Sequence, residues 1–491
     1  MNFLTVPAAS HESSPDIVIV GAGPNGLTAG VLLARAGLAV HIVEASATPG
    51  GGCRSGPLTL PGFVHDVCAA VHPMGVLSPV FRDIGLENFG LQWVNSRVPL
   101  AHPLPDGSAA MLDHSLAATA ERLGYDGVAW ERMLRPFANE EFVQSLLRPV
   151  WYPGYGSLIR KARFGLLALR SCESVARSGF RGEAARALFA GCAAHSVVAL
   201  DRAGTASFGL ILAAVAHTID WPCARGGSQA ITNALVRAFE SHGGVLKLGQ
   251  RVSTIRELPP ARAILFDLSP RQVARIAGDA LPTGYRSRIE RFRHGPAVFK
   301  LDWALRCPIP WHNAECRAAT TVHVCGSFED VLRSEADATN GRAPERPFVL
   351  VAQQSLIDST RAPAGQHTGW GYCHIPNGST ENMTDRIEAQ IERFAPGFRD
   401  CILARHTVSP ADLEAYNPAM IGGDMAGGQN NLTQFLFRPV PRLNPYRTPN
   451  PRLFLCSSST PPGGGVHGMC GYHAAQTVLR KLGLPTSNQR D

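Results

Sequence analysis

The stretch Ile17–Glu44, "IVIVGAGPNGLTAGVLLARAGLAVHIVE", decides the fold class of this chain. Its first four residues form an apolar run typical of a strand buried in a parallel sheet. Gly21, Gly23 and Gly26 follow in the spacing GxGxxG, and an apolar helical pattern comes next. A second apolar strand then ends at Glu44. This order of strand, turn, helix and strand predicts an α/β fold with a Rossmann-type nucleotide-binding unit.

The three glycines and the acid have distinct physical roles in such a unit. Gly21 allows a tight turn, Gly23 lets the backbone approach a pyrophosphate, and Gly26 lets helix and strand pack closely. Glu44 is placed to accept hydrogen bonds from ribose hydroxyls, and it would repel a 2′-phosphate, so FAD or NAD is favoured over NADP. A glycine-rich turn in an unrelated α/β unit is the alternative. The other candidate cofactor contacts of this unit are Pro24, Asn25 and Ala45.

Composition limits the possible classes of protein. The chain has 491 residues, which predicts two domains, and its 45% hydrophobic and 17% charged content is typical of a globular protein. The net charge of +7 is modest and the basic residues are scattered, so we expect no nucleic-acid partner. The 12 Cys and 17 His do not occur at zinc-binding spacings, so no metal is expected.

The sequence also indicates where the protein would reside. No CxxC occurs, which favours a reduced, intracellular protein. The N-terminus lacks the basic and apolar regions of a signal peptide, and no uninterrupted apolar run reaches about 18 residues. A cytoplasmic location is therefore predicted.

A second glycine cluster, Gly50–Gly52, follows Glu44 in "EASATPGGGCRSG" and carries a family resemblance. With Arg54, it resembles the corresponding segment of the flavin amine oxidase and phytoene desaturase superfamily. Two later stretches, "QHTGWGYCHIPNGS" and "GGDMAGGQNNLTQFLFRPV", are similar to bacterial phytoene-dehydrogenase-like proteins. That group includes a human pyridine-nucleotide-disulphide oxidoreductase domain protein, and the resemblance covers nearly the whole chain.

The resemblance implies FAD as the cofactor and supplies roles for further residues. In the family, Gly51, Gly52 and Arg54 lie against the FAD pyrophosphate, and Ala70, Val71 and His72 pass beside the isoalloxazine ring. A strand predicted in "VLKLGQRVSTI" brings Val252 against the adenine. The resemblance also implies an FAD-binding domain assembled from residues 1–75, 216–284 and 445–491. Residues 76–215 and 285–444 would form a mixed-sheet and helical substrate domain.

Lys300 is one of only four lysines in a chain whose other 42 basic residues are Arg. It lies in "AVFKLDW", where Val298, Lys300 and Asp302 alternate with apolar residues as in a strand. Flavin amine oxidases carry a Lys in a similar strand that holds a water near flavin N5, which implies a catalytic role for Lys300. A solvent-exposed lysine on the strand face is the alternative.

The stretch "SSSTPPGGGVHGMCG", Ser457–Gly471, lies between a predicted strand and a predicted helix. In the family this loop runs along the ribityl chain, and the helix N-terminus points at the flavin, where it stabilises negative charge. The implied contacts are Ser458, Ser459, Val466, Gly468 and Met469. His467 is a second candidate catalytic residue, as a proton acceptor or a hydrogen-bond partner of the flavin; a loop histidine in solvent is the alternative.

Together these features predict an FAD-dependent oxidoreductase that desaturates a hydrophobic small molecule. Hydride would pass to flavin N5, and the electrons to dioxygen or a quinone, because a separate NAD(P)H-binding motif is absent from the sequence. An amine oxidase, a saturase working in reverse and a non-enzymatic flavoprotein module are alternatives. The substrate and the oligomeric state are not determined by the sequence.

The stretch "WYPGYGSLIRKARFGLLALRS" raises the possibility of peripheral membrane contact. Trp151, Tyr152 and Tyr155 precede a cluster of basic residues and an apolar run, a combination that suits a helix lying on a membrane surface. An ordinary amphipathic helix is the alternative.

Overall fold

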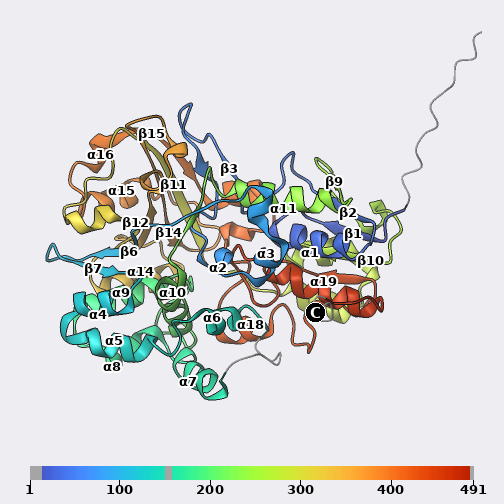
Figure 1. The fold of residues 1–491 in the computed structure, drawn as a ribbon, viewed down its shortest axis with the longest axis horizontal. Coiled ribbons are helices and arrows are strands. Elements are labelled where there is room, and N and C mark those ends of the chain that lie inside the picture. The colour runs from blue at the N-terminus through green and yellow to red at the C-terminus, as the bar shows by residue number, and fades with distance from the viewer. Residues whose placement is uncertain (1–13, 150–156, 487–491) are drawn as a thin grey trace, which may run out of the picture.

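The computed structural model describes residues 14–149 and 157–486. Two main sheets organise the chain, one at each side of the molecule (Figure 1). A layer of helices from the middle of the sequence lies below the larger sheet in this view.

The first sheet is parallel throughout and has the strand order β16–β10–β1–β2–β9. Its strands are β1 (Ile17–Val20), β2 (Val40–Val43), β9 (Val245–Lys247), β10 (Ala263–Phe266) and β16 (Leu453–Leu455). They come from three well-separated segments of the chain. The sequence likewise predicted a domain assembled from separate segments. The domain boundaries themselves stay a prediction.

Helices cover both faces of this sheet, which explains why β1 is apolar at every position. Ile17 and Ile19 pack on the side of α1 (Pro24–Arg35), α11 (Gln229–Ser241) and α19 (Met469–Lys481). Val18 and Val20 pack on the side of α12 (Pro270–Ala277) and α13 (Thr283–Glu290). The chain therefore brings its first and last helices, α1 and α19, side by side (Figure 1).

The strand predicted over "VLKLGQRVSTI" is shorter than expected. β9 ends at Lys247, and Val252 lies in an irregular segment that precedes a short 3₁₀ turn at Ile255–Glu257. Gly249, with a φ of +69°, interrupts the extended backbone after β9. Val252 nevertheless remains half-buried.

The second sheet has the order β15–β11–β14–β13–β12–β6–β7 and is antiparallel except between β12 and β6. Its strands are β6 (Val98–Pro103), β7 (Ala109–Leu112), β11 (Ala297–Leu305), β12 (Ala319–Val324), β13 (Val349–Ala352), β14 (His367–Ile375) and β15 (Ile402–Val408). In β11 the predicted alternation is present: Phe299, Leu301 and Trp303 pack in one cluster, while Val298 packs in another. Two small ribbons pair β3 (Ser55–Gly56) with β4 (His65–Asp66), and β5 (Trp93–Val94) with β8 (Cys223–Ala224).

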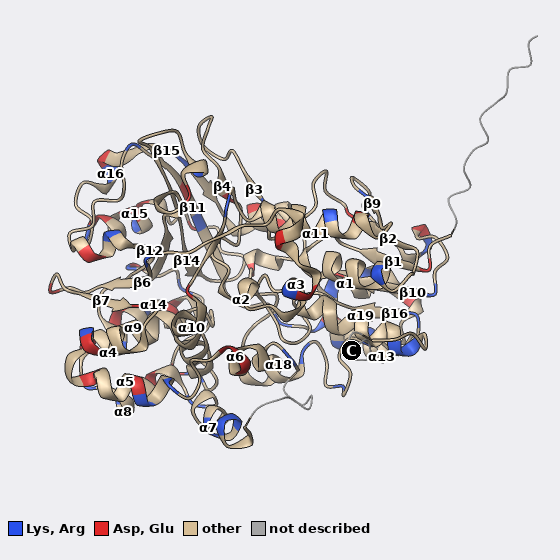
Figure 2. Ribbon diagram, in the orientation of Figure 1, with Lys and Arg blue, Asp and Glu red and all other residues tan. Residues whose placement is uncertain are grey.

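The helical layer packs against this second sheet. It comprises α4 (Leu116–Arg122), α5 (Gly127–Leu134), α6 (Glu140–Leu146), α7 (Leu158–Ala168), α8 (Cys172–Gly179), α9 (Glu183–Ala194) and α10 (Ala206–Ile219). The remaining helices are α2 (Pro73–Val76), α3 (Pro79–Ile84), α14 (Phe328–Thr339), α15 (Thr384–Glu392), α16 (Phe398–Cys401), α17 (Pro410–Tyr416) and α18 (Leu432–Phe437). Charged residues are spread over both sides of the molecule (Figure 2).

Helix α7 forms where the amphipathic helix was predicted, and it exposes Leu158, Ile159 and Leu166. The aromatic residues Trp151, Tyr152 and Tyr155 of the same prediction lie outside the described residues. Among the described residues, no helix is both long and apolar enough to span a bilayer.

Candidate active site

A cavity of about 380 Å³ opens at the carboxyl ends of β1, β2 and β10. We call it the glycine-loop cavity. This edge of a parallel sheet is where nucleotides bind in Rossmann-type folds. Its lining includes the predicted contacts Gly21, Gly23, Pro24, Asn25, Glu44, Ala45, Gly51, Gly52, Arg54, Val71, Val252, Ser458, Ser459 and Val466. Residues from the N-terminal, middle and C-terminal parts of the sequence thus meet around one space.

The turn between β1 and α1 explains why glycines occupy this wall. A Cβ on Gly26 would lie 2.2 Å from the carbonyl oxygen of Gly21, and a Cβ on Gly23 would lie 2.5 Å from Oδ2 of Asp267. Gly26 does not itself line the cavity. It lets the start of α1 approach the turn closely, which is the role predicted from the motif.

Asp267 is a cavity residue that the sequence reading missed. It directly follows β10, and its Oδ2 accepts a hydrogen bond of 2.9 Å from the Gly26 backbone N–H. Burial raises its pKa to about 7, with a smaller contribution from Glu44, and the backbone N–H bonds only partly offset this rise. The signal in the sequence was its position at the end of an apolar strand, "AILFD", which is the same place that Glu44 occupies after β2.

Glu44 and Arg54 hold the loops around the cavity. The Glu44 carboxylate accepts hydrogen bonds of 2.8 Å from the backbone N–H groups of Ala22 and Ser46. Arg54 lies 3.7 Å from Glu44 and donates to the carbonyl oxygens of Thr48 and Pro49. Both side chains still line the cavity, so they combine a loop-ordering role with a position beside any ligand.

A second cavity, of about 340 Å³, adjoins the first, and we call it the apolar cavity. It is lined by Cys68, Ala69, Ala70, Val71, His72, Pro73, Met74, Gly75, Leu146, Leu147, His195, Val197, Phe208, Ile211, Leu212, Trp221, Thr321, Leu350, Trp370, Tyr372, Met425, Ala426, Asn430, Phe435, Pro462, Gly464, Gly465, Val466 and His467. Among these described lining residues there is no Asp, Glu, Lys or Arg.

The two cavities share one wall. Seven residues line both: Cys68, Ala69, Val71, Met425, Gly464, Gly465 and Val466. This wall combines the segment predicted to pass beside the flavin ring with the C-terminal glycine loop. A dinucleotide in the first cavity could therefore present one end to a small molecule in the second.

His72 and His467 lie at the apolar cavity but are engaged by neighbouring groups. His72 Nε2 is 2.8 Å from Ser228 Oγ, and His467 Nδ1 accepts the backbone N–H of Met469 at 3.0 Å. Burial lowers the pKa of each imidazole to about 4. His467 is therefore buried and neutral at pH 7, and it holds the start of α19.

Gly468 and Met469 do not line either cavity. Gly468 instead lies at the N-cap of α19, where a Cβ would lie 2.4 Å from Thr28 Oγ1. Its close contact with α1 places the C-terminal helix against the first one. Its role in the described structure is packing of this helix pair.

Lys300 lies behind the cavity wall and does not line either cavity. It is 2% exposed and forms an ion pair with Asp302. The alternative prediction, a solvent-exposed lysine on the strand face, is therefore wrong. Nζ lies 5.8 Å from the Trp370 ring centroid. Its charge also lowers the pKa of the Cys68 thiol, which burial nevertheless raises to about 11. Its partner Asp302 raises the same pKa, so the two members of the ion pair have opposite effects on Cys68.

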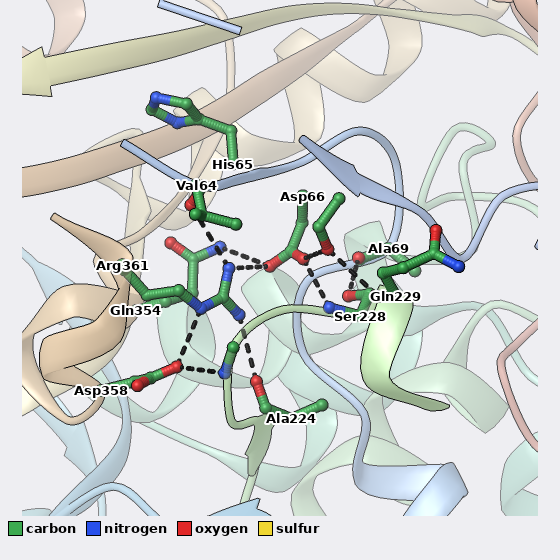
Figure 3. A network of polar contacts seen from close by, with 12 residues as sticks. Val64, His65, Asp66, Ala69, Ala224, Ser228, Gln229, Gln354, Asp358 and Arg361 are labelled. Atoms are coloured by element: carbon green, nitrogen blue, oxygen red, sulfur yellow. Dashed lines mark hydrogen bonds and ion pairs between the residues drawn. The ribbon is translucent and has the colours of Figure 1, made fainter. Parts of the chain in front are cut away.

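A buried polar network fixes the segment that leads into this wall (Figure 3). Arg361 Nη1 lies 3.0 Å from Asp66 Oδ2, and its Nε lies 2.9 Å from Asp358 Oδ2. Asp66 also accepts the backbone N–H of Ser228 at 2.7 Å, and Ser228 Oγ donates to the carbonyl oxygen of Ala69. Burial alone would raise the pKa of Asp66, but Arg361 and these hydrogen bonds lower it. The carboxylate is therefore held ionised in the interior.

Comparisons with known proteins show what this chain is similar to. The family model for an NAD(P)-binding Rossmann-like domain matches residues 19–84, which contain the glycine turn and Glu44. The relatives include pyridine nucleotide-disulfide oxidoreductase domain-containing protein 2 of Rattus norvegicus, 26% identical, with coverage of 95% of this chain and 94% of that protein. Phytoene dehydrogenase of Streptomyces griseus is 26% identical, with 92% of each chain covered. Hydroxyneurosporene desaturase of Cereibacter sphaeroides is 26% identical, covering 95% of this chain and 98% of that one.

Solved structures share the fold at lower identity. An oxidoreductase from Methanosarcina mazei has a TM-score of 0.64 at 14% identity, covering 94% of this chain and 99% of that chain. A putrescine oxidase triple mutant has a TM-score of 0.63 at 14% identity, with 95% and 98% covered. The predicted fold class, Rossmann-type with a second mixed sheet, is confirmed, as is the resemblance in sequence to phytoene dehydrogenases; the likeness to amine oxidases is one of fold. The names of these proteins agree with the predicted class of oxidoreductases.

Proposed function

We propose that this protein is an FAD-dependent oxidoreductase that dehydrogenates an uncharged, hydrophobic small molecule. The observation that carries the proposal is the shared wall between a cavity built on a dinucleotide-binding motif and a second cavity lined without charged side chains. The relatives named phytoene dehydrogenase and hydroxyneurosporene desaturase support the reaction type.

The glycine-loop cavity suits an extended dinucleotide. The absence of a Cβ on Gly23 lets the turn lie against Asp267 at the edge of the cavity, and the start of α1 favours an anion. Oδ1 of Asn25 is buried without a hydrogen-bond partner among the described residues. Gly23, Asn25, Glu44 and Arg54 would hold the pyrophosphate and ribose, and the shared wall would hold the flavin. When bound, FAD would supply an acceptor for the hydride at N5; the substrate proton would leave to a base or water, and dioxygen or a quinone would take up the electrons.

The chain's own residues would orient the substrate and exclude water from it. Leu147, Phe208, Ile211 and Leu212 present apolar surface to the substrate. His72 and His467 are held neutral by burial and are bonded to neighbouring groups, so they would maintain the shape of the cavity. Lys300, paired with Asp302 outside both cavities, would support the strand next to the shared wall.

The same cavity argues against an amine oxidase. An ammonium group is costly to bury without a paired charge, and the described lining supplies no carboxylate. A saturase would use the same residues in reverse, so the direction is decided by experiment. The predicted membrane contact also stays a prediction, supported by the exposed leucines of α7.

Anaerobic reduction of the purified protein tests the proposal. We expect a flavin that dissociates on denaturation and is identified as FAD by chromatography. Neutral hydrocarbons that have a C–C bond able to lose two hydrogens, and their alcohols, should bleach its visible absorbance, whereas primary amines of equal size should not. Reoxidation by dioxygen and by a soluble quinone would identify the acceptor, and a reduced flavin that saturates an added alkene would establish the reverse direction. A protein that binds no flavin, or whose flavin only amines reduce, would contradict the proposal.

A further inference from the structure

The floor of the apolar cavity is one face of the seven-stranded sheet. Thr321 pairs with Ala352, which pairs with Trp370, while His323 pairs with Leu350, which pairs with Tyr372. Residues in register across neighbouring strands point to the same face of a sheet. Thr321, Leu350, Trp370 and Tyr372 all line the cavity, so this sheet face supplies hydroxyl and indole groups to a space whose described lining has no charged side chain.

Several other polar side chains of the cavity already have partners. Asn430 donates to the carbonyl oxygen of Ser196 and accepts from Arg438, while Trp221 Nε1 donates to the carbonyl oxygen of Leu212. His467 Nδ1 and His72 Nε2 are bonded as described above, while Nδ1 of His72 has no hydrogen-bond partner among the described residues. The bonded groups hold the walls of the cavity.

The polar groups of the sheet face differ in this respect. Thr321 Oγ1 and Trp370 Nε1 are buried and have no hydrogen-bond partner among the described residues. Tyr372 lies on the same sheet face and is buried, and burial raises the pKa of its hydroxyl. Such groups are costly to leave unpaired, so a ligand oxygen that accepts their hydrogen bonds would stabilise the site.

His195 forms the adjoining wall, directly after α9, and it is half-buried where it lines the cavity. Its Nε2 lies 3.2 Å from Nε2 of His323, so one of these nitrogens donates and the other accepts. Burial lowers the pKa of His195 to about 3. Burial also holds the pKa of His323 well below its ordinary value. The pair is neutral at pH 7, and because the two Nε2 atoms bond each other, Nδ1 is the nitrogen through which His195 would bond a ligand without a charge.

We infer that the apolar cavity recognises a hydrophobic molecule bearing a neutral oxygen, a hydroxyl or carbonyl, bound by His195 and Tyr372. The inference rests on the proposed function for the location of the substrate, and it adds the substrate's chemical class. A pure hydrocarbon would leave the donors of the sheet face unpaired. A carboxylate or an ammonium would enter a cavity whose described lining has no opposite charge.

Binding of matched eight-carbon probes tests the inference without requiring turnover. The probes are n-octane, 1-octanol, 2-octanone, octanoate and octylammonium, titrated into the purified full-length protein at pH 7. Fluorescence of Trp221 and Trp370, which line the cavity, reports binding. The measured quantity is the ratio of the octanol or octanone affinity to the octane affinity, because this ratio removes the common contribution of the apolar chain.

In Tyr372→Phe and in His195→Leu we expect this ratio to fall about five- to tenfold relative to the wild type, since each variant removes one hydrogen bond. Leu212→Ala is the matched control, because it alters the apolar lining alone and should weaken all neutral probes alike. Tyr372→Phe preserves the ring, so it keeps the test available if His195→Leu does not fold.

An unchanged ratio in both variants, stronger binding of octanoate or octylammonium than of 2-octanone, or no saturable binding of any probe would overturn the inference. A shifted ratio in a protein that lacks flavin would contradict only the proposed function. An unchanged ratio in a protein whose flavin is reduced by a hydrocarbon would contradict only the inference.

Discussion

At the scale of single residues, Asp267 is the least expected feature of the cofactor site. A carboxylate beside the turn that should hold a pyrophosphate would repel the ligand unless it were neutral. Because the pKa of Asp267 is about 7, a small change in its surroundings is enough to change its charge at neutral pH. A bound pyrophosphate would raise that pKa further, so cofactor binding should be accompanied by uptake of a proton.

The pH dependence of cofactor affinity follows from this linkage. FAD should bind progressively more weakly as the pH rises through about 7, approaching a tenfold loss per pH unit at higher pH. Asp267→Asn removes the titration and should flatten the profile between pH 6 and 9. The bound flavin is first removed, directly or by unfolding and refolding the protein. Fluorescence titration with FAD then measures the affinity.

The control is Asp279→Asn, the same substitution at a fully exposed carboxylate. It should leave the profile of the wild type intact. A profile in Asp267→Asn as steep as that of the wild type would show that another group controls the pH dependence.

At the scale of elements, the unit formed by β1, the glycine turn and α1 depends on close backbone approach. In Gly26→Ala the new methyl group would meet the Gly21 carbonyl oxygen, so the helix must shift away from the turn. We expect the substitution to cost about 1–3 kcal/mol or more and to reduce the bound flavin. The ratio of flavin to protein absorbance and the thermal midpoint measure both effects.

Gly165→Ala, in α7, is the matched control, because a Cβ there meets no atom within 4 Å. Alanine favours a helix over glycine by up to about 1 kcal/mol, so this variant should be as stable as the wild type or more so. Full flavin content in Gly26→Ala with an unchanged midpoint would contradict the assigned role of the turn.

At the scale of the whole molecule, the Asp66–Arg361–Asp358 network joins segments more than 290 positions apart in the chain (Figure 3). Arg361→Met leaves two carboxylates buried without their cation, which should lower the free energy of unfolding by about 3–5 kcal/mol. Urea denaturation measures this change. The loss should also reduce ligand affinity in both cavities, because Ser228 orders the segment that forms their shared wall.

Arg342→Ala provides the comparison, since Arg342 pairs with Asp337 at the surface and is 67% exposed. Its effect should stay within about 0.5 kcal/mol. Equal urea midpoints for the two variants would show that the buried network does not stabilise the fold.

The sequence by itself determined the features that depend on neighbouring residues. The spacing of Gly21, Gly23 and Gly26 and the acid at Glu44 predicted the nucleotide-binding unit, because turn geometry and strand burial are set within a few residues. Alternation in β11 likewise predicted the strand that carries Lys300. In contrast, the predicted extension of β9 to Val252 was wrong, because strand ends depend on pairing partners that local patterns do not specify.

Only the tertiary structure decided what those units surround. The neutral state of His467, the burial of Lys300 beside Asp302 and the place of Asp267 under Gly26 all depend on contacts between residues far apart in the chain. The uncharged lining of the apolar cavity depends on the same assembly, since its residues span positions 68 to 467. Charge state and cavity polarity are set by desolvation and by the sum of surrounding groups, which exist only once distant segments have packed together.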